Sequence, residues 1–261
     1  MTNKNLYKIA RKVRRDILKI SHQAKSSHVG SCLSIVDILV ALYFSLFKNK
    51  SKKNFEFILS KGHAGLALYC ILYNLKVISK KILYSYGLNN TLLMQHVSHK
   101  VPQVKVSTGS LGHGLPIGAG IALSSQLKNA KKKIFILISD GELNEGSTWE
   151  ALMFASHHNL NNLVVIVDYN KIQSLDLVEK TLKVEPLSNK FKSFGCDVKI
   201  IEGHNFSKIL SALKIRNNRG PLVIIANTIK GKGVSFMENK VSWHYKSPND
   251  VELFKALKEL N

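Results

Sequence analysis

The chain has 261 residues, of which 45% are hydrophobic, and a formal net charge of +21 at pH 7. We expect this length to form a single domain over residues 1–261. No apolar run reaches the roughly 18–20 residues of a membrane-spanning helix, and the N-terminus lacks the apolar segment of a secretory signal. Its three cysteines (Cys32, Cys70 and Cys196) form no C-x-x-C pair. They favour a reducing compartment, and we expect the cytoplasm.

The positive charge first suggests a nucleic-acid-binding protein. However, 33 of the 38 basic residues are lysines, and they are spread along the whole chain. Arginine dominates the bidentate recognition of phosphates and bases, and the sequence has no basic segment rich in aromatic residues. We therefore interpret the charge as a compositional bias and expect no dedicated nucleic-acid partner. A positive surface would still suit sugar phosphates or an acidic partner protein.

The first 75 residues predict helices and one short strand. Apolar residues at helical spacing, with basic residues between them, indicate an amphipathic helix over residues 6–24. A loop with His28 and Gly30 follows, and Ser34 is placed to cap a second helix. The apolar run FEFILS predicts a strand over residues 55–60. His63 then lies at a strand-to-helix corner, where ligands of open α/β sheets gather.

The middle of the chain contains a glycine cluster. Residues 76–100 are poorly patterned and predict a short helix and an exposed loop, and residues 104–107 are a possible strand. The cluster opens a helix with Pro116 in its first turn. Gly112, Gly114 and Gly118 also resemble a weak dinucleotide-binding fingerprint. We discount that alternative because Asp140 is better explained by the pairing described next.

Residues 134–173 read as strand, tight turn, helix and strand. Both apolar runs, 134–139 and 163–167, are typical of parallel strands that are buried on both faces. A helical crossover places their carboxyl ends at one edge of the sheet, and neighbouring strands lie about 5 Å apart. Further runs predict helices over 187–194, 207–215 and 251–260, and strands over 198–201 and 221–226. The fold class is therefore α/β, an open and mostly parallel sheet with helices on both faces.

Polar groups at these two strand ends predict a cation site. Asp140 follows one strand and Asn170 the other, and the backbone carbonyl of Ile172 offers a third oxygen. Three oxygen ligands suit Mg²⁺, with Ca²⁺ possible, and argue against zinc or copper. Gly141 allows backbone N–H groups to approach an anion such as a diphosphate. The alternative is an ordinary βαβ unit in which Asp140 and Asn170 only cap a turn and start a loop.

The same stretch resembles a known family. SDGELNEG, then WEA and NLVVIVDYNKIQ, is similar to the thiamine-diphosphate motif, and more narrowly to transketolase, although Ser139 replaces the first glycine of the family's GDG. The resemblance implies that Asp140, Asn170 and the Ile172 carbonyl hold Mg²⁺. It also implies that Gly141, Asn170 and Ile172 contact thiamine diphosphate, and that Glu145 lies at a subunit interface.

Other segments extend the resemblance from residue 6 to about residue 248. SKGH supplies His63, which in the family contacts the diphosphate, and TGSLG supplies Gly109, Ser110 and Leu111, whose backbone meets the aminopyrimidine ring. SHVG stands where the family has GHPG. The family's substrate-contacting histidines correspond to His28, His96 and His244, and we expect these three to position substrate and to move protons. His244, in WH, also faces the diphosphate. Lys230 and Lys232 fit either solvated loop charge or a role in the site.

The resemblance corresponds to the first half of a full-length transketolase. In that family the glutamate that assists the cofactor, and the arginines that grip the sugar phosphate, lie in the following domain. We therefore expect the N-terminal subunit of a split transketolase, which transfers a two-carbon ketol unit from a ketose to an aldose together with a C-terminal subunit. Self-association to an α2β2 assembly is also expected. The alternatives are the alpha-type subunit of a 2-oxo-acid dehydrogenase, or a catalytically silent or basic binding protein on the same fold.

Overall fold

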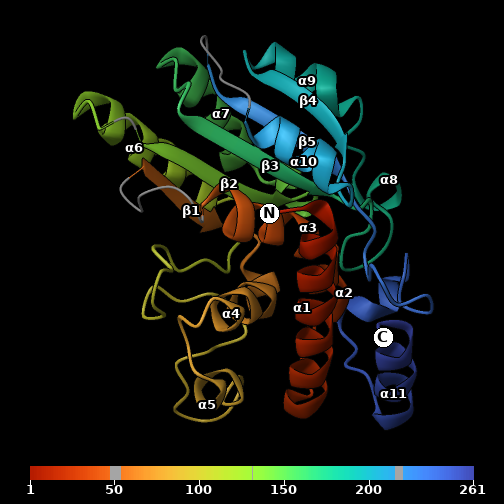
Figure 1. The fold of residues 1–261 in the computed structure, drawn as a ribbon. Helices are drawn as coiled ribbons and strands as arrows, with labels where there is room; N and C mark the ends of the chain where they lie inside the picture. Colours follow the sequence, from red (N-terminus) through yellow and green to blue (C-terminus); the bar gives the residue numbers. More distant parts are fainter. Residues whose placement is uncertain (48–53, 131, 215–219) are drawn as a thin grey trace.

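The computed structural model describes residues 1–47, 54–130, 132–214 and 220–261. Its centre is a five-stranded sheet with the strand order β1-β2-β3-β5-β4, and all four pairings are parallel. Figure 1 shows helices above and below this sheet, so the predicted α/β class is confirmed. In the part of the chain that is described, no helix is both long and apolar enough to cross a membrane.

The strands are rich in apolar residues, continuously so in the middle of the sheet and only in part at its two edges. They are β1 (Phe55–Leu59), β2 (Lys133–Ser139), β3 (Leu163–Tyr169), β4 (Asp197–Glu202) and β5 (Leu222–Asn227). Every residue of β3 is buried, as expected for the middle of a sheet that is covered on both faces. β2 and β3 are immediate neighbours, with Ser139 opposite Asp168. The predicted adjacency of the two polar strand ends is therefore confirmed.

Successive side chains of each strand enter two different cores, because a strand alternates its faces. On β2, Phe135 and Leu137 join one apolar cluster, whereas Ile136 and Ile138 join the other. The first cluster contains side chains of the helices α1 (Asn3–Ala24), α2 (Val29–Ser34), α3 (Val36–Ala41), α4 (Gly65–Asn74) and α10 (Phe206–Leu213). The second contains side chains of α6 (Gly114–Leu127), α7 (Gly146–His157) and α9 (Leu187–Ser193).

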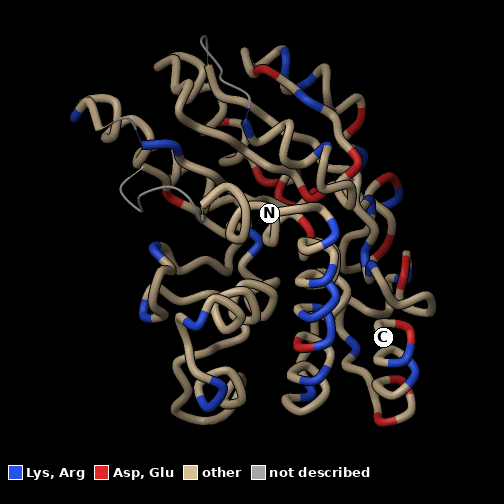
Figure 2. Tube along the Cα trace, in the orientation of Figure 1, with Lys and Arg blue, Asp and Glu red and all other residues tan. Residues whose placement is uncertain are grey.

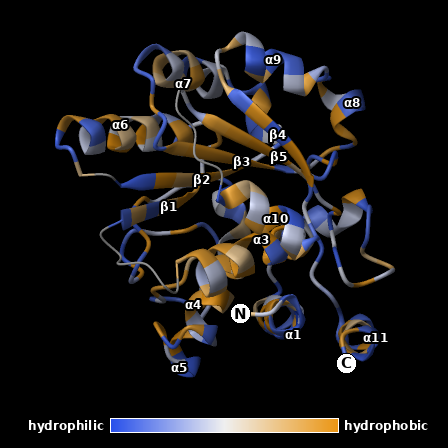
Figure 3. Ribbon diagram, turned by 45° about the horizontal axis from the view of Figure 1, so that its top comes forward, coloured by the Kyte–Doolittle hydropathy of each residue, from blue (hydrophilic) through white to orange (hydrophobic). Residues whose placement is uncertain are grey.

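The remaining helices lie at the periphery. They are α5 (Lys80–Leu83), α8 (Val178–Thr181) and α11 (Asp250–Glu259), the last of which packs beside α1. A π-helical turn, Leu42–Leu46, extends α3. Figure 3 shows the hydrophobic central strands β3 and β5 between layers of helices that carry hydrophilic residues on their outer sides. Burial of this apolar surface is the main force that holds the layers together.

Gly118 sets the distance between α6 and the sheet. A Cβ at this position would lie 2.0 Å from Cδ1 of Ile136, which is far inside van der Waals contact. The glycine therefore lets the helix backbone pack directly on β2. This places the amino end of α6 beside the carboxyl ends of the strands, where Gly114 itself packs against Ser60.

Three predictions need correction. Helix α2 begins at Val29, so Ser34 ends this helix instead of capping the next one, and its hydroxyl donates to Asp168 Oδ1 at 2.5 Å. Residues 104–107 form no strand, although Val104 is buried in the first core. Helix α10 ends at Leu213, and the predicted end at Ile215 lies outside the described residues.

Lysines and arginines are distributed over most elements of the fold. Figure 2 shows them on helices of both layers, with the densest series along α1. One basic residue of α1, Arg14, is buried and paired with Asp37. This distribution agrees with the interpretation of the charge as a property of the whole composition.

Candidate functional site

A cavity of about 350 Å³ lies at the carboxyl ends of β1, β2 and β3. In parallel α/β sheets this edge is where ligands bind. The cavity brings together nearly all the site residues expected from the sequence, although they come from segments far apart in the chain. Its lining includes His28, His63, His96, Gly109, Leu111, Asp140, Gly141, Glu145, Asn170, Ile172 and His244.

The three oxygen ligands expected for a cation lie on this cavity. Asp140 is buried, and its two carboxylate oxygens accept hydrogen bonds from the backbone N–H groups of Gly141 at 2.9 Å and Lys171 at 2.8 Å. Asn170 Oδ1 accepts from the Ile172 N–H at 3.1 Å. Burial, followed by the nearby Asp168 carboxylate, raises the pKa of Asp140 to about 7. The carboxylate thus lies in surroundings that a bound cation would stabilise.

The orientation of the Asn170 amide is set by its neighbours. Its Nδ2 donates to Asp168 Oδ2 at 3.0 Å and to Ser34 Oγ at 3.4 Å. Because both contacts take the amide nitrogen, the amide oxygen is turned to the side of Ile172. Among the described residues no group of three or more His, Cys, Asp and Glu side chains is placed to hold a metal ion. A cation here would therefore need the amide and backbone oxygens as well as the one carboxylate.

Three buried polar atoms of this cavity have no hydrogen-bond partner among the described residues. They are Ser139 Oγ, Asn144 Oδ1 and Gln173 Nε2. Buried polar atoms in native proteins are nearly always satisfied, so such a group needs an explanation. Gln173 also packs over Gly141, where a Cβ would lie 3.8 Å from its Cδ. Unsatisfied donors and acceptors around one hollow indicate a polar ligand, and they fit a diphosphate with a hydrated cation.

The expected histidines form one cluster. The ring centroid of His28 lies 5.1 Å from that of His244 and 5.3 Å from that of His63. The His96 ring lies 6.1 Å from His28. His28 precedes α2 with a positive φ of 70°, and its N–H donates to the His244 carbonyl at 2.6 Å. Val29, which stands where the family has proline, is the first residue of α2.

Three of these histidines, His28, His63 and His244, are held in the neutral form. Burial, followed by the neighbouring His96 and Lys230, lowers the pKa of His28 to about 4. Burial, with Lys230 second, lowers the pKa of His244 to about 3. The pKa of His63 is also far below its ordinary value, chiefly because the side chain is buried. A neutral imidazole can donate one hydrogen bond and accept another, which suits the binding of hydroxyl groups.

A buried ion pair under the cavity was not predicted from the sequence. Lys61 and Asp168 form a salt bridge although they are 107 residues apart in the chain, and both are at most 1% exposed. Asp168 Oδ1 also accepts from Ser34 and Thr228, each at 2.5 Å. Burial alone would raise the pKa of Asp168, but Lys61 holds it below its ordinary value. This charged carboxylate in turn fixes Asn170, as described above.

Glu142 is a second unpredicted residue. It is fully buried and accepts hydrogen bonds from the Ser60 hydroxyl and from the backbone N–H groups of Ser139 at 3.0 Å and Gly112 at 3.1 Å. Its side chain thereby ties the end of β1, the end of β2 and the glycine cluster together. The only sequence signal was its position two residues after Asp140, which does not by itself indicate burial.

Lys230 and Lys232, whose roles the sequence left open, have different surroundings in the structure. Lys230 is 0% exposed, and its ammonium donates to the backbone carbonyls of Ile172 at 3.1 Å and Gln173 at 3.0 Å. It also contacts His244 Nδ1 at 2.8 Å. Burial, followed by the charge of Lys61, lowers the pKa of Lys230 to about 8. The side chain of Lys232 is 32% exposed and pairs with Glu238.

The glycine cluster borders the other side of the cavity. Gly109 lies against His96, and a Cβ there would be 3.5 Å from the imidazole ring. Leu111 lines the cavity, whereas Ser110 is exposed and is not part of the lining. Glu145 is exposed at the rim, immediately before α7. An exposed acidic residue at the edge of an open cavity is available to a second chain.

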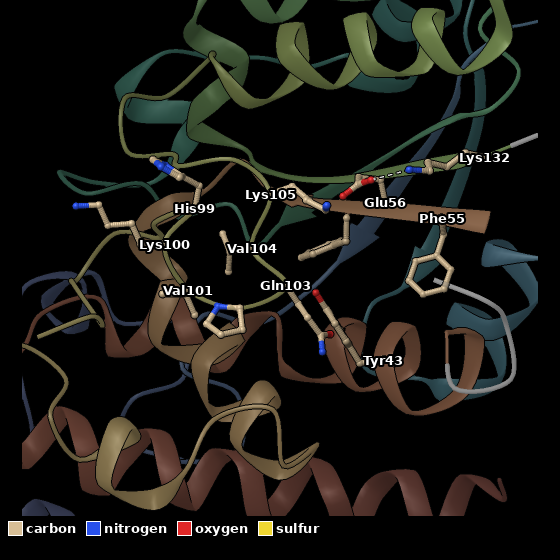
Figure 4. A pocket seen from close by; sticks show the side chains of 12 residues that line it. Tyr43, Phe55, Glu56, His99, Lys100, Val101, Gln103, Val104, Lys105 and Lys132 are labelled. Atoms are coloured by element: carbon tan, nitrogen blue, oxygen red, sulfur yellow. Dashed lines mark hydrogen bonds and ion pairs between the residues drawn. The ribbon is translucent and has the colours of Figure 1, made fainter. Parts of the chain in front are cut away.

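A larger cavity of about 540 Å³ lies at the amino end of β1 and is not the candidate site. Glu56 is already paired with Lys132 at 3.1 Å, as Figure 4 shows, and His99 bonds to the Ser107 hydroxyl at 2.8 Å. The side chains of His99 and Lys100 extend away from that ion pair (Figure 4). Unlike the smaller cavity, it has no cluster of imidazoles beside buried carboxylates.

Comparison with known proteins gives a family. Residues 4–259 match the family described as "Transketolase, thiamine diphosphate binding domain". An apulose-4-phosphate transketolase subunit of Actinobacillus succinogenes is 38% identical over 98% of this chain and 95% of its own. The 6-deoxy-6-sulfo-D-fructose transketolase subunit SqwG of a Clostridium species is also 38% identical, over 88% of this chain and 86% of its own.

Full-length transketolases match over part of their length. Human transketolase is 33% identical over 91% of this chain, which covers 39% of the human protein. The crystal structure of transketolase from Campylobacter jejuni superposes with a TM-score of 0.93 at 27% identity, and this chain spans 43% of it. The chain therefore belongs to the transketolase family and corresponds to the thiamine diphosphate binding domain of that family.

Proposed function

We propose that this chain is the N-terminal subunit of a split transketolase. Its cavity would bind thiamine diphosphate with Mg²⁺, and with a partner subunit it would transfer a two-carbon ketol unit from a ketose phosphate to an aldose phosphate. The observation that carries the proposal is the single cavity that joins Asp140, Asn170 and Ile172 to the four-histidine cluster. The two relatives that are named as transketolase subunits support the split arrangement, because this chain matches 95% and 86% of their own lengths.

The proposed metal ligands are Asp140, Asn170 and the Ile172 carbonyl, with Mg²⁺ preferred over Ca²⁺. A carbonyl oxygen has two lone pairs, so the Ile172 oxygen can accept from Lys230 and still face a cation. The unsatisfied atoms of Ser139, Asn144 and Gln173 are the contacts left for phosphate oxygens and metal-bound water. When bound, thiamine diphosphate would supply an electron sink for the negative charge that develops on the transferred two-carbon unit.

The remaining roles fall to side chains that already line the cavity. His63, His244 and the N–H groups beside Gly141 are proposed to hold the diphosphate, and the backbone of residues 109–111 to support the aminopyrimidine ring. His28, His96 and His244 are proposed to orient substrate hydroxyls and to accept or return protons. The low pKa values of His28 and His244 keep both rings neutral at pH 7, so that each ring can accept one hydrogen bond and donate another.

A second chain is part of the proposal. The partner subunit would provide the glutamate and the sugar-phosphate contacts that the family keeps in its following domain. Glu145 is exposed at the cavity rim, which suits an interface residue, and we propose an α2β2 assembly. We further propose that this assembly works in the cytoplasm on sugar phosphates, without nucleic-acid or membrane partners.

Isothermal titration calorimetry with thiamine diphosphate tests the cofactor site. We expect binding in the presence of Mg²⁺ and at least about 10-fold weaker binding in EDTA, because the cation links protein oxygens to the diphosphate. Thiamine, which lacks the diphosphate, should bind much more weakly than the cofactor. Equal affinity for thiamine and thiamine diphosphate, or affinity that is independent of Mg²⁺, would contradict the proposed site.

A further inference from the structure

A buried charged cluster lies behind the cavity and has no part in the function proposed so far. Arg14 of α1 and Asp37 of α3 form a two-point ion pair, with N–O distances of 3.0 and 2.6 Å. His204, in the turn after β4, places its Nδ1 2.7 Å from Asp37 Oδ2. Asp37 is 2% exposed, and a carboxylate so deeply buried requires partners of this kind.

The hydrogen bonds of the cluster continue to one loop. His204 Nε2 accepts from the backbone N–H of Ile229 at 2.8 Å. Since a backbone N–H can only donate, Nε2 carries no proton, and His204 must donate to Asp37 through Nδ1. The Nε of Arg14 donates to the Lys232 carbonyl at 2.9 Å. The cluster therefore holds the backbone on both sides of Lys230, at Ile229 and at Lys232.

The loop that carries these anchors has a backbone that other residues would not adopt readily. Gly231 and Gly233 have φ values of 82° and 98°. A Cβ at Gly233 would lie 2.9 Å from Cδ of Arg14, so the arginine packs directly on this glycine. The N–H of Gly231 also donates to the carbonyl of Gly30, in α2, at 3.0 Å. Glycine-rich segments lose much conformational entropy when they are ordered, and external contacts must compensate for that loss.

We infer that the cluster of Arg14, Asp37 and His204 positions Lys230 in the cofactor cavity. Asp37 is then a positioning residue: it acts through the loop and touches no ligand. The fixed backbone delivers the Lys230 ammonium to the Ile172 and Gln173 carbonyls and to His244. Loss of the cluster would let the loop relax and the ammonium leave this site, which would also release the Ile172 carbonyl. The effect on cofactor binding rests on the proposed function.

The first test needs no cofactor. Lysines of the purified chain are acylated with acetic anhydride, and the rate at each position is read by peptide mass spectrometry. Lys230 is 0% exposed and Lys232 has a side chain that is 32% exposed, so Lys230 should react much more slowly in the wild type. We expect Asp37→Asn to raise the Lys230 rate at least about 5-fold and to change the Lys232 rate little. Unchanged protection of Lys230 in folded Asp37→Asn would overturn the inference, whatever the function.

The second test is a double-mutant cycle on thiamine diphosphate affinity, with Lys230→Met as the other change. We expect Asp37→Asn to weaken binding about 10-fold in the wild-type background, in the range of residues that support a ligand indirectly. In the Lys230→Met background it should have almost no further effect, because its route to the cavity is gone. An equal loss in both backgrounds would mean general structural damage and would overturn the positioning role.

Two more variants keep the test decisive. If Asp37→Asn does not fold, His204→Ala takes its place, since it removes the link to Ile229 and leaves the Arg14–Asp37 pair intact. The control is Glu56→Gln, which breaks a half-buried ion pair with Lys132 at the far end of β1 and should change neither readout. If Asp37→Asn exposes Lys230 to acylation but the wild-type chain binds no thiamine diphosphate, the positioning role of the cluster is supported and the cofactor proposal is refuted. Failure of the inference and failure of the proposed function are therefore distinguishable.

Discussion

Replacement of Asp140 by asparagine should separate ligand binding from folding. The asparagine keeps one oxygen, which can accept a hydrogen bond from the Lys171 N–H. It loses the second carboxylate oxygen, which in the wild type accepts from the Gly141 N–H. The loss of one hydrogen bond to a charged group should lower the unfolding free energy by no more than about 3 kcal/mol. A direct metal ligand should matter more than an indirect one, whose loss costs about 10–100-fold in metal affinity. We therefore expect thiamine diphosphate to bind at least about 100-fold more weakly.

Calorimetry at a fixed excess of Mg²⁺ measures the affinity, and urea unfolding without cofactor measures stability. Asp176→Asn is the matched control, because Asp176 also accepts from the N–H of the next residue, at 2.7 Å, and lies outside the cavity lining. It should leave the affinity unchanged. A dissociation constant for Asp140→Asn within about 3-fold of the wild type would refute the metal assignment and leave Asp140 as a turn cap.

Three further outcomes are expected. Burial would raise the pKa of Asp37, but Arg14 holds it at about 2, below 3.8, so this carboxylate stabilises the fold above pH 4. That contribution, roughly 2 kcal/mol, should disappear between pH 4 and pH 2 in urea unfolding of the wild type and be absent in Asp37→Asn. Gly118→Ala should lower the unfolding free energy by about 1–3 kcal/mol, because its methyl group would collide with Ile136. Duplex DNA binding, measured by fluorescence anisotropy, should vanish by about 0.2 M salt, and a sequence-selective complex above that would contradict the compositional interpretation of the charge.

The sequence predicted the sheet and most of the cavity because both depend on local patterns. Apolar runs identified β2 and β3, and the position of Asp140 and Asn170 directly after them sufficed to bring the two residues to one edge. Helix α2 was missed because its glycine and serines are typical of a loop, which is what the sequence predicted there. The alternation of valines at 104–107 is typical of a strand, but Val104 is instead part of a loop packed on the first core.

The supporting residues could not be predicted for a different reason. Ser34 and Asp168 are 134 residues apart, and neither has a neighbour in sequence that signals the contact. A serine before an apolar helix is typical of a cap, so the local reading of Ser34 was reasonable and wrong. A lysine that precedes a glycine in a polar segment, such as Lys230, is equally typical of an exposed loop. Only the packing of the loop against α1 and α2 determines that this lysine is buried.

The most direct test of the account is a ketol-transfer assay on the purified chain and on the chain with its partner. The partner is obtained by co-purification of the native protein and identified by mass spectrometry. We expect no turnover by the pure chain with thiamine diphosphate and Mg²⁺, because the proposed half-site lacks the glutamate and the sugar-phosphate contacts of the second subunit. Addition of the partner should restore transfer from a ketose phosphate to an aldose phosphate. Robust turnover by the chain alone, with the partner shown to be absent, would contradict the split-enzyme proposal.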